Sequence, residues 1–229
     1  DEAHALEPVD GVFATDDLAG AEVADVGSRA LVVGGPTALG VAGEALAKSL
    51  DSTGVKSTFC EYEGVTSAGA TARFADKARE LTCDVIVGVG GGRIMDLAKA
   101  IGLATRAAVI EVPTSIATCA ACTPLSVMYT EEGGFESCLR FRREVDAVIV
   151  DFGVMATQPA RLVAAGVLDA MAKHIEISNG VSAEGLMDED VQRFCAYEYA
   201  RTNRSLLERL GPVAYKDVAS HRMTPALQS

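Results

Sequence analysis

A cluster of glycines followed by an arginine is the segment of this sequence best suited to bind a phosphate. It reads GVGGGR at residues 88–93, between a short apolar run and an amphipathic pattern over residues 94–105. Glycines lack a Cβ, so the backbone can approach a pyrophosphate closely and present N–H groups at a helix N-terminus. Arg93 can pair with phosphate oxygens. We predict a phosphate site here; the alternative is a tight turn that binds nothing.

A second candidate is the pair Cys119 and Cys122, which has CxxC spacing. A zinc site would need a second pair or histidines, and neither lies nearby in the sequence. A redox role would need Cys119 at the start of a helix that follows a strand. We favour small residues lining a close-packed loop, with the metal or redox role as the alternative. The six cysteines are scattered over a chain too large to need disulfides, which is typical of a reduced cytoplasm.

Alternating strands and helices must position the glycine loop. The uninterrupted apolar run Ala30–Val33 is typical of a strand buried on both faces. Four more strands are predicted over residues 55–62, 84–88, 109–113 and 146–151, and helices over 37–50 and 94–105. This alternation indicates an α/β fold with a parallel sheet. Ligands in such sheets bind beyond the carboxyl ends of the strands, where the glycine loop lies.

The pattern becomes purely helical after residue 158. We predict helices over residues 161–178, 188–210 and 212–227. The domain boundary is expected near residues 152–158, with a dinucleotide-binding α/β domain over 1–153 and an all-helical metal and substrate domain over 154–229. Because the last helix ends abruptly, we expect the helical domain to be incomplete.

Composition and charge narrow the function classes. Apolar residues make up 49% of the chain, enough to bury a core and to exclude disorder as the default state. The net charge of −12 repels phosphate backbones and anionic lipids, which argues against nucleic acid and membrane partners. No apolar run approaches the roughly 18 residues that a membrane span needs, and the acidic N-terminus does not resemble a signal peptide. We expect a cytoplasmic protein that acts on a small molecule.

Several segments resemble the iron-containing alcohol dehydrogenases. GGGRIMDLAK (90–99) resembles their GGG-x-x-x-D-x-A-K signature, and VPTS (112–115) resembles their next strand end. PLSVMY (124–129) is similar to the L-S-V-x-Y stretch of the glycerol dehydrogenase branch, and GVLDA (166–170) to the element that opens the helical domain. The resemblance implies an NAD(P)-dependent oxidoreductase that interconverts an alcohol or 2-hydroxyacid and its carbonyl form. It also implies a homo-oligomer.

The resemblance implies roles for individual residues. Gly91, Gly92 and Arg93 would hold the pyrophosphate. The adenosine and nicotinamide sides would be lined by Thr114, Thr123, Leu125 and Tyr129. Two of these have simpler alternatives, a strand-end hydroxyl at Thr114 and a core aromatic at Tyr129. Asp96 and Lys99 would be structural, with Lys99 pairing across a helical turn.

The cofactor choice depends on the end of the first strand. NAD-preferring members of the family have an aspartate there, which binds the ribose hydroxyls. This chain has Gly34 and Gly35 instead. A carboxylate repels a 2′-phosphate and its absence admits one. We therefore favour NADP over NAD, with both left open, and assign the difference to Gly35.

The substrate side departs from the glycerol dehydrogenases at two places. They have an acidic residue at the position of Cys119, and a cysteine cannot accept a strong hydrogen bond from a polyol. This argues against glycerol as the substrate. The stretch TCAACTP (118–124) resembles the hydroxycarboxylate dehydrogenase branch of the family, which implies a 2-oxoacid or 2-hydroxyacid instead. Lys173 stands where many relatives have a histidine ligand, so it is a candidate to bind a substrate carboxylate. Its alternative is a surface lysine.

The metal site is the least complete part of the resemblance. Asp169 is the one family ligand that we can match, and His174 is a residue off the family spacing, about 100° round the helix. The two other histidine ligands of the family would lie beyond residue 229, so we expect a C-terminally truncated form. Catalytic zinc or iron needs three protein ligands, so the divalent metal belongs to the full-length enzyme. The alternative is a noncatalytic nucleotide-binding remnant or partner protein.

Overall fold

The computed structural model describes residues 12–15, 20–179, 191–222 and 224–225. The chain divides into two compact units. The α/β unit comprises Asp1–Ser115 and Cys119–Met155, and the helical unit comprises Ile116–Thr118 and Ala156–Ser229. None of the helices in the described part of the chain is both long and apolar enough to cross a membrane.

Six parallel strands form the sheet of the α/β unit, in the order β1-β8-β5-β4-β2-β3. They are β1 (Val12–Thr15), β2 (Arg29–Gly34), β3 (Lys56–Glu61), β4 (Val85–Gly90), β5 (Ala108–Pro113) and β8 (Ala147–Asp151). The predicted α/β fold with a parallel sheet is confirmed. The strand β1 was not predicted, because its four residues are too few to show a period.

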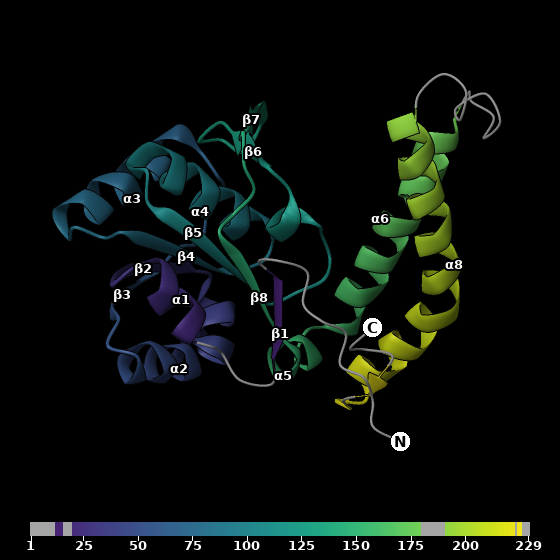
Figure 1. The fold of residues 1–229 in the computed structure, drawn as a ribbon, viewed down its shortest axis with the longest axis horizontal. Helices are drawn as coiled ribbons and strands as arrows, with labels where there is room; N and C mark the ends of the chain where they lie inside the picture. Colours follow the sequence, from purple (N-terminus) through teal and green to yellow (C-terminus); the bar gives the residue numbers. More distant parts are fainter. Residues whose placement is uncertain (1–11, 16–19, 180–190, 223, 226–229) are drawn as a thin grey trace. The chain divides into compact units, whose positions relative to one another are not determined.

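Helices cover both faces of this sheet (Figure 1). They are α1 (Gly20–Val26), α2 (Pro36–Ser52), α3 (Ala68–Glu80) and α4 (Gly92–Thr105). Leu46 and Leu50 of α2 pack with Val87 on one face, while Phe74 of α3 and Leu97 of α4 pack on the other. The helices α1 and α3 were not predicted. They bury mainly small residues, which leave a weak apolar period.

An antiparallel hairpin follows a short 3-10 turn, η1 (Ala120–Cys122). Its strands are β6 (Leu125–Tyr129) and β7 (Phe135–Arg140). The hairpin is fastened to α4 because the Ser126 hydroxyl donates to the carbonyl of Asp96 at 2.9 Å. A short helix, α5 (Phe152–Ala156), follows β8, and its residues up to Met155 belong to the α/β unit. Neither the hairpin nor α5 was predicted.

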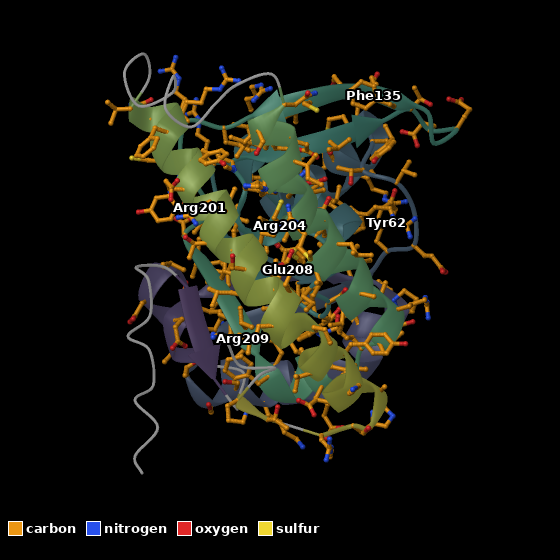
Figure 2. The ribbon with its side chains drawn as sticks, turned by 90° about the vertical axis from the view of Figure 1, so that its right-hand side faces the viewer. Tyr62, Phe135, Arg201, Arg204, Glu208 and Arg209 are labelled. Atoms are coloured by element: carbon orange, nitrogen blue, oxygen red, sulfur yellow. The ribbon has the colours of Figure 1, made fainter. Side chains whose placement is uncertain are left out.

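In its described residues, the helical unit contains two long helices that pack on each other, α6 (Ala160–Ser178) and α8 (Val191–Ala219). The bounds of α6 agree with the predicted helix to within one residue. Gly166 of α6 is required by packing, since an added Cβ there would collide with the backbone of Ile116. Along α8, Arg204 and Glu208 lie one turn apart and pair at 2.8 Å (Figure 2).

The predicted break of the last helix at Pro212 is wrong. The helix α8 continues through Pro212 to Ala219 and does not extend to residue 227. Proline removes one helical hydrogen bond, but the following turns are held by tertiary packing of Ala214 and Val218 against Val163. The left-handed backbone of His221 (φ 51°) follows the true end. Residues 188–190, 223 and 226–227 of the two predicted helices lie outside the described residues.

Candidate nucleotide-binding site

Three strand ends meet at the carboxyl edge of the sheet. The register pairs Gly34 of β2 with Val89 of β4, and Gly90 of β4 with Pro113 of β5. The next residues along these strands are Gly35, Gly91 and Thr114. The N–H of Thr114 donates to the carbonyl of Gly90 at 2.9 Å, which ties the end of β5 to the end of β4. The fold therefore brings together these three predicted cofactor residues.

The glycine loop forms the start of α4. Gly90 has a φ of 155°, which residues with side chains rarely adopt, and Gly91 caps the helix, which begins at Gly92. A Cβ added to Gly91 or to Gly35 would meet no atom within 4 Å. An anion in this open space would be close to the first N–H groups of α4 and the positive end of its dipole. The loop thus fits a cofactor pyrophosphate.

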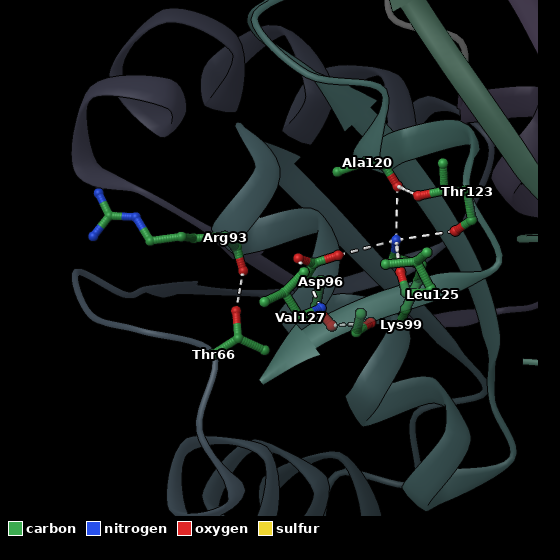
Figure 3. Close-up of polar contacts among 9 residues, drawn as sticks. Thr66, Arg93, Asp96, Lys99, Ala120, Thr123, Leu125 and Val127 are labelled. Carbon is green, nitrogen blue, oxygen red and sulfur yellow. Dashed lines mark hydrogen bonds and ion pairs between the residues drawn. The ribbon is translucent and has the colours of Figure 1, made fainter. Parts of the chain in front are cut away.

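Arg93 is held by its backbone while its side chain extends outward. Its carbonyl accepts a hydrogen bond from the Thr66 hydroxyl at 2.8 Å (Figure 3). The guanidinium is exposed and makes no ion pair with any residue that the structure describes. Thr66 is fully buried, and its own carbonyl accepts the N–H of Tyr129 at 2.8 Å. Thr66 therefore links the glycine loop to the hairpin strand that carries Tyr129.

A buried lysine holds the next segment of the site. The Lys99 ammonium of α4 donates to the carbonyls of Ala120 (2.7 Å), Thr123 (3.1 Å) and Leu125 (Figure 3). It also lies 3.1 Å from Asp96 Oδ1, which confirms the predicted pairing across a turn. The three ammonium protons can therefore all donate to one short segment, residues 120–125. The predicted residues Thr123 and Leu125 are thus fixed relative to α4 through their backbone.

Two buried carboxyl groups adjoin this lysine. Burial raises the pKa of Asp96, against the charge of Lys99 and a hydrogen bond from the N–H of Val127, which lower it. Glu111 of β5 is fully buried, and neither carboxyl oxygen has a hydrogen-bond partner. Burial raises its pKa well above the ordinary value. Gly88 provides the room, since a Cβ there would collide with Glu111 Oε2. Burial therefore favours the protonated form of Glu111 in the folded protein.

The cysteine pair does not form a metal or redox centre in the described geometry. Cys119 and Cys122 are exposed at the two ends of η1, whose Ala120 and Ala121 are buried. Partial burial of the thiol raises the pKa of Cys122, whereas a reactive cysteine needs a lowered pKa. The described residues contain no group of three His, Cys, Asp or Glu side chains suited to a metal ion.

The predicted residues of the helical unit lie on an exposed part of α6. Lys173 Nζ is 3.7 Å from Asp169 Oδ1 and 3.2 Å from Glu176 Oε2. His174 is partly buried, with Nδ1 3.4 Å from Arg204 Nη1 and its ring against Tyr197. Among the residues that the structure describes, Asp169 belongs to no group of three His, Cys, Asp or Glu side chains that could hold a metal ion. The described residues therefore do not by themselves complete a site for a catalytic zinc or iron.

Sequence reasoning missed three residues that shape the site: Thr66, Glu111 and Ser126. Ser67, beside Thr66, caps α3 by accepting the N–H of Ala70 at 3.1 Å. A helix cap before an alanine-rich run was the available signal. Glu111 stands alone in an apolar strand, and such a charge in a buried run was a signal too. No sequence signal pointed to Ser126, because its hydrogen-bond partner, the carbonyl of Asp96, is 30 residues away.

The parallel sheet, its two helical layers and the glycine loop at the carboxyl edge define an α/β domain of the doubly wound type. The family model for iron-containing alcohol dehydrogenases matches residues 11–152. The chain belongs to this family, as its motifs predicted.

Similar proteins carry alcohol and hydroxyacid dehydrogenase names. Glycerol dehydrogenase of Pseudomonas putida is 33% identical over 199 residues, which cover 86% of this chain and 54% of that protein. Hydroxycarboxylate dehydrogenase A of Escherichia coli K12 is 39% identical over 95 residues, or 40% of this chain and 25% of that protein. A crystal structure of a probable glycerol dehydrogenase from Sinorhizobium meliloti 1021 matches with a TM-score of 0.79 at 28% identity. The match covers 96% of this chain and 61% of that one. The chain spans about half the length of the curated relatives it matches.

Proposed function

We propose that this chain binds NAD(P) at the glycine loop and forms the cofactor-binding part of an oxidoreductase that interconverts an alcohol or 2-hydroxyacid and its carbonyl form. The observation that carries the proposal is the open space beside Gly91 at the N-terminus of α4. Family membership and the names of the relatives support the reaction class.

The residues of the carboxyl edge have distinct tasks in this proposal. The N–H groups after Gly91 and the guanidinium of Arg93 bind the pyrophosphate. Thr114, whose hydroxyl makes no hydrogen bond with a described residue, and Tyr129 face the rest of the cofactor. The bound nicotinamide supplies or accepts the hydride. Lys99 is a positioning residue, because it fixes the backbone of Thr123.

We propose a 2-hydroxyacid and its 2-oxoacid as the substrate pair, with glycerol as the alternative. Cys119 replaces the acid that would bind a polyol, and Lys173 supplies a cation for a substrate carboxylate. The ion pairs of Lys173 with Asp169 and Glu176 are half exposed. Exposed pairs of this kind contribute only about 0–1 kcal/mol, so a substrate carboxylate can compete for the lysine. Asp169 would be one ligand of a metal whose other ligands are not among the described residues.

The decisive experiment replaces Gly91 with valine and measures NADP and NAD binding by calorimetry. A β-branched side chain would occupy the space of the pyrophosphate, so we expect at least a tenfold loss of affinity, about 1.4 kcal/mol. Gly40→Val is the matched control, because Gly40 also faces open space but lies on the exposed surface of α2. Unchanged binding by Gly91→Val would show that the loop is only a turn.

Turnover separates the enzyme from a noncatalytic nucleotide-binding protein. The complete gene product should oxidise or reduce the cofactor in the presence of 2-oxoacids, 2-hydroxyacids or polyols. Lys173→Gln should raise KM for a 2-oxoacid more than KM for glycerol, because only the oxoacid carries a carboxylate. Cofactor binding without turnover of any of these substrates would favour the noncatalytic alternative.

A further inference from the structure

A cavity of the α/β unit lies away from the glycine loop. It has a volume of about 500 Å³ and is lined by Val109 and Asp146, which are at the amino ends of β5 and β8. The C-terminal turn of α4, with Leu103 and Arg106, forms another part of the wall. The glycine loop is at the opposite, carboxyl edge of the sheet. The cavity is within the 300–1,000 Å³ range of small-molecule sites.

Cationic side chains outnumber carboxylates in this cavity. Lys99 and Arg143 line it but are matched by partners, Asp96 at 3.1 Å and Asp146 at 2.6 Å. Three more arginines, at positions 106, 140 and 142, make no ion pair or side-chain hydrogen bond with any residue that the structure describes. Glu144 is the one other carboxylate in the lining. The cavity is therefore positive, although the whole chain carries a net charge of −12.

A purely structural role explains only one of the three arginines. Arg106 caps the C-terminus of α4, where a cation is stabilised by the helix dipole. Arg140 ends the strand β7 and Arg142 lies in the connection to β8, so neither has a helix end to neutralise. Like charges gathered in a cleft repel each other and focus a positive potential on it. Binding of an anion would relieve this repulsion.

The rest of the lining is apolar. Phe141 lies between Arg140 and Arg142 in the sequence, and Leu103 is 57% exposed although its side chain is large and apolar. Pro124 and Val145 complete this wall. An inorganic ion would leave these side chains in water, whereas an organic group would cover them. Guanidinium groups suit phosphate because they bind it through paired, charge-assisted hydrogen bonds.

We propose that this cavity is a binding site for a small organic phosphate, separate from the cofactor site. Arg140 and Arg142 hold the phosphate, with Arg106 beside them, and the apolar wall at Phe141 and Leu103 covers the organic part. Because Lys99 lines the cavity and also holds the loop of Thr123, a ligand here would contact the residue that positions the proposed cofactor segment.

Calorimetric titration with phenyl phosphate tests the site. We expect saturable binding, at least fivefold tighter than inorganic phosphate, which lacks the organic part, and tighter than benzyl alcohol, which lacks the charge. Replacing both Arg140→Gln and Arg142→Gln should weaken it at least tenfold. The charge-matched control, Lys48→Gln with Lys77→Gln on the exposed surfaces of α2 and α3, should keep the wild-type affinity.

The glycine loop is the competing site for the same probe. Gly91→Val should leave phenyl phosphate binding unchanged while it lowers NADP affinity, so that the two proposals can fail separately. Loss of phenyl phosphate binding in Gly91→Val, or its displacement by NAD, would assign the probe to the cofactor site and overturn the second site. Equal affinities of the arginine variant and the lysine control, or no binding by the wild type, would overturn it as well. Unchanged thermal midpoints show that both double variants fold.

Discussion

Two lysines of this chain pair with an aspartate on their own helix, yet they have opposite surroundings. Lys99 of the α/β unit is 3.1 Å from Asp96, and the two side chains are 3% and 10% exposed. Lys173 of the helical unit is 3.7 Å from Asp169, and these side chains are 47% and 49% exposed. The first lysine also donates to three carbonyls of a distant loop. The second lies near Asp169 and Glu176 of its own helix, both of them exposed.

The difference shows that burial, and not spacing, decides what such a pair does. A buried charge that loses its partner costs about 3–5 kcal/mol, so the Lys99 cluster must stay assembled and can fix a loop. An exposed pair contributes about 0–1 kcal/mol, so Lys173 and Asp169 can exchange partners at little cost. The α/β unit therefore contains a preformed framework for its proposed site. The printed ion pairs of α6 are instead about half exposed to solvent.

The largest expected effect comes from removing the two lysines in parallel. Lys99→Met leaves Asp96 and three carbonyls without their cation, and we expect it to lower the free energy of unfolding by about 3–5 kcal/mol. Lys173→Met, the matched change in an exposed pair, should lower it by about 1 kcal/mol or less. Urea denaturation followed by circular dichroism measures both. Similar losses for the two variants would break the comparison.

The second prediction places a new exposed carboxylate in the α/β unit. Gly35 has an extended backbone (φ −70°, ψ 152°), so Gly35→Asp introduces no strain. Its charge should repel a 2′-phosphate and favour the ribose hydroxyls of NAD, which shifts the ratio of NADP to NAD affinity at least tenfold, about 1.4 kcal/mol. Gly40→Asp adds the same charge elsewhere on α2 and should leave the ratio unchanged. An unchanged ratio in Gly35→Asp would mean that the ribose is bound elsewhere.

The third prediction compares how the removal of a buried and of an exposed glutamate changes the pH dependence of stability. Because the pKa of Glu111 is raised in the folded state, this side chain keeps its proton while the unfolded chain loses it above its ordinary value of 4.5. The folded state then binds more protons, so this group lowers stability as the pH rises from about 4.5 towards its folded pKa. Glu111→Gln should remove this loss, and its stability relative to wild type should increase from pH 5 to pH 8. Glu176→Gln, the exposed control, should follow the wild-type pH profile.

Much of the α/β unit could be predicted from the sequence because its signals are local. The run Ala30–Val33 indicated a strand buried on both faces. The glycine loop indicated the start of α4, although this helix begins at Gly92 and not at residue 94. Weak or short patterns were lost: α3 has Phe74 as its one large buried residue. At Pro212 a local rule failed, because packing of the following turn against α6 outweighs a missing hydrogen bond.

The site was predictable only in part, since its framework depends on distant contacts. The pairing of Lys99 with Asp96 follows from their spacing in a helix. Its bonds to Ala120 and Leu125 span 21 and 26 residues, and no periodic pattern reports them. Thr66 was missed for the same reason, as its partner Arg93 is 27 residues away. Family motifs supplied the roles of Thr114 and Tyr129 as cofactor residues, and these roles remain predictions.

The smallest expected effect concerns Asp169, the other half of the exposed pair. Asp169→Asn keeps the shape of the side chain and removes one charge, so the free energy of unfolding should change by about 1 kcal/mol or less.

Zinc or iron bound to the purified 229-residue chain after dialysis against a mild chelator should stay well below one equivalent, for wild type and variant alike. A catalytic divalent ion needs about three protein ligands, and the described residues contain no such group. His174, the nearest nitrogen ligand along α6, has Nδ1 3.4 Å from Arg204 Nη1. A stoichiometric, chelator-resistant metal that is lost in Asp169→Asn would contradict this. It would show that Asp169 has enough ligands around it to hold a metal ion, although its pair with Lys173 is exposed.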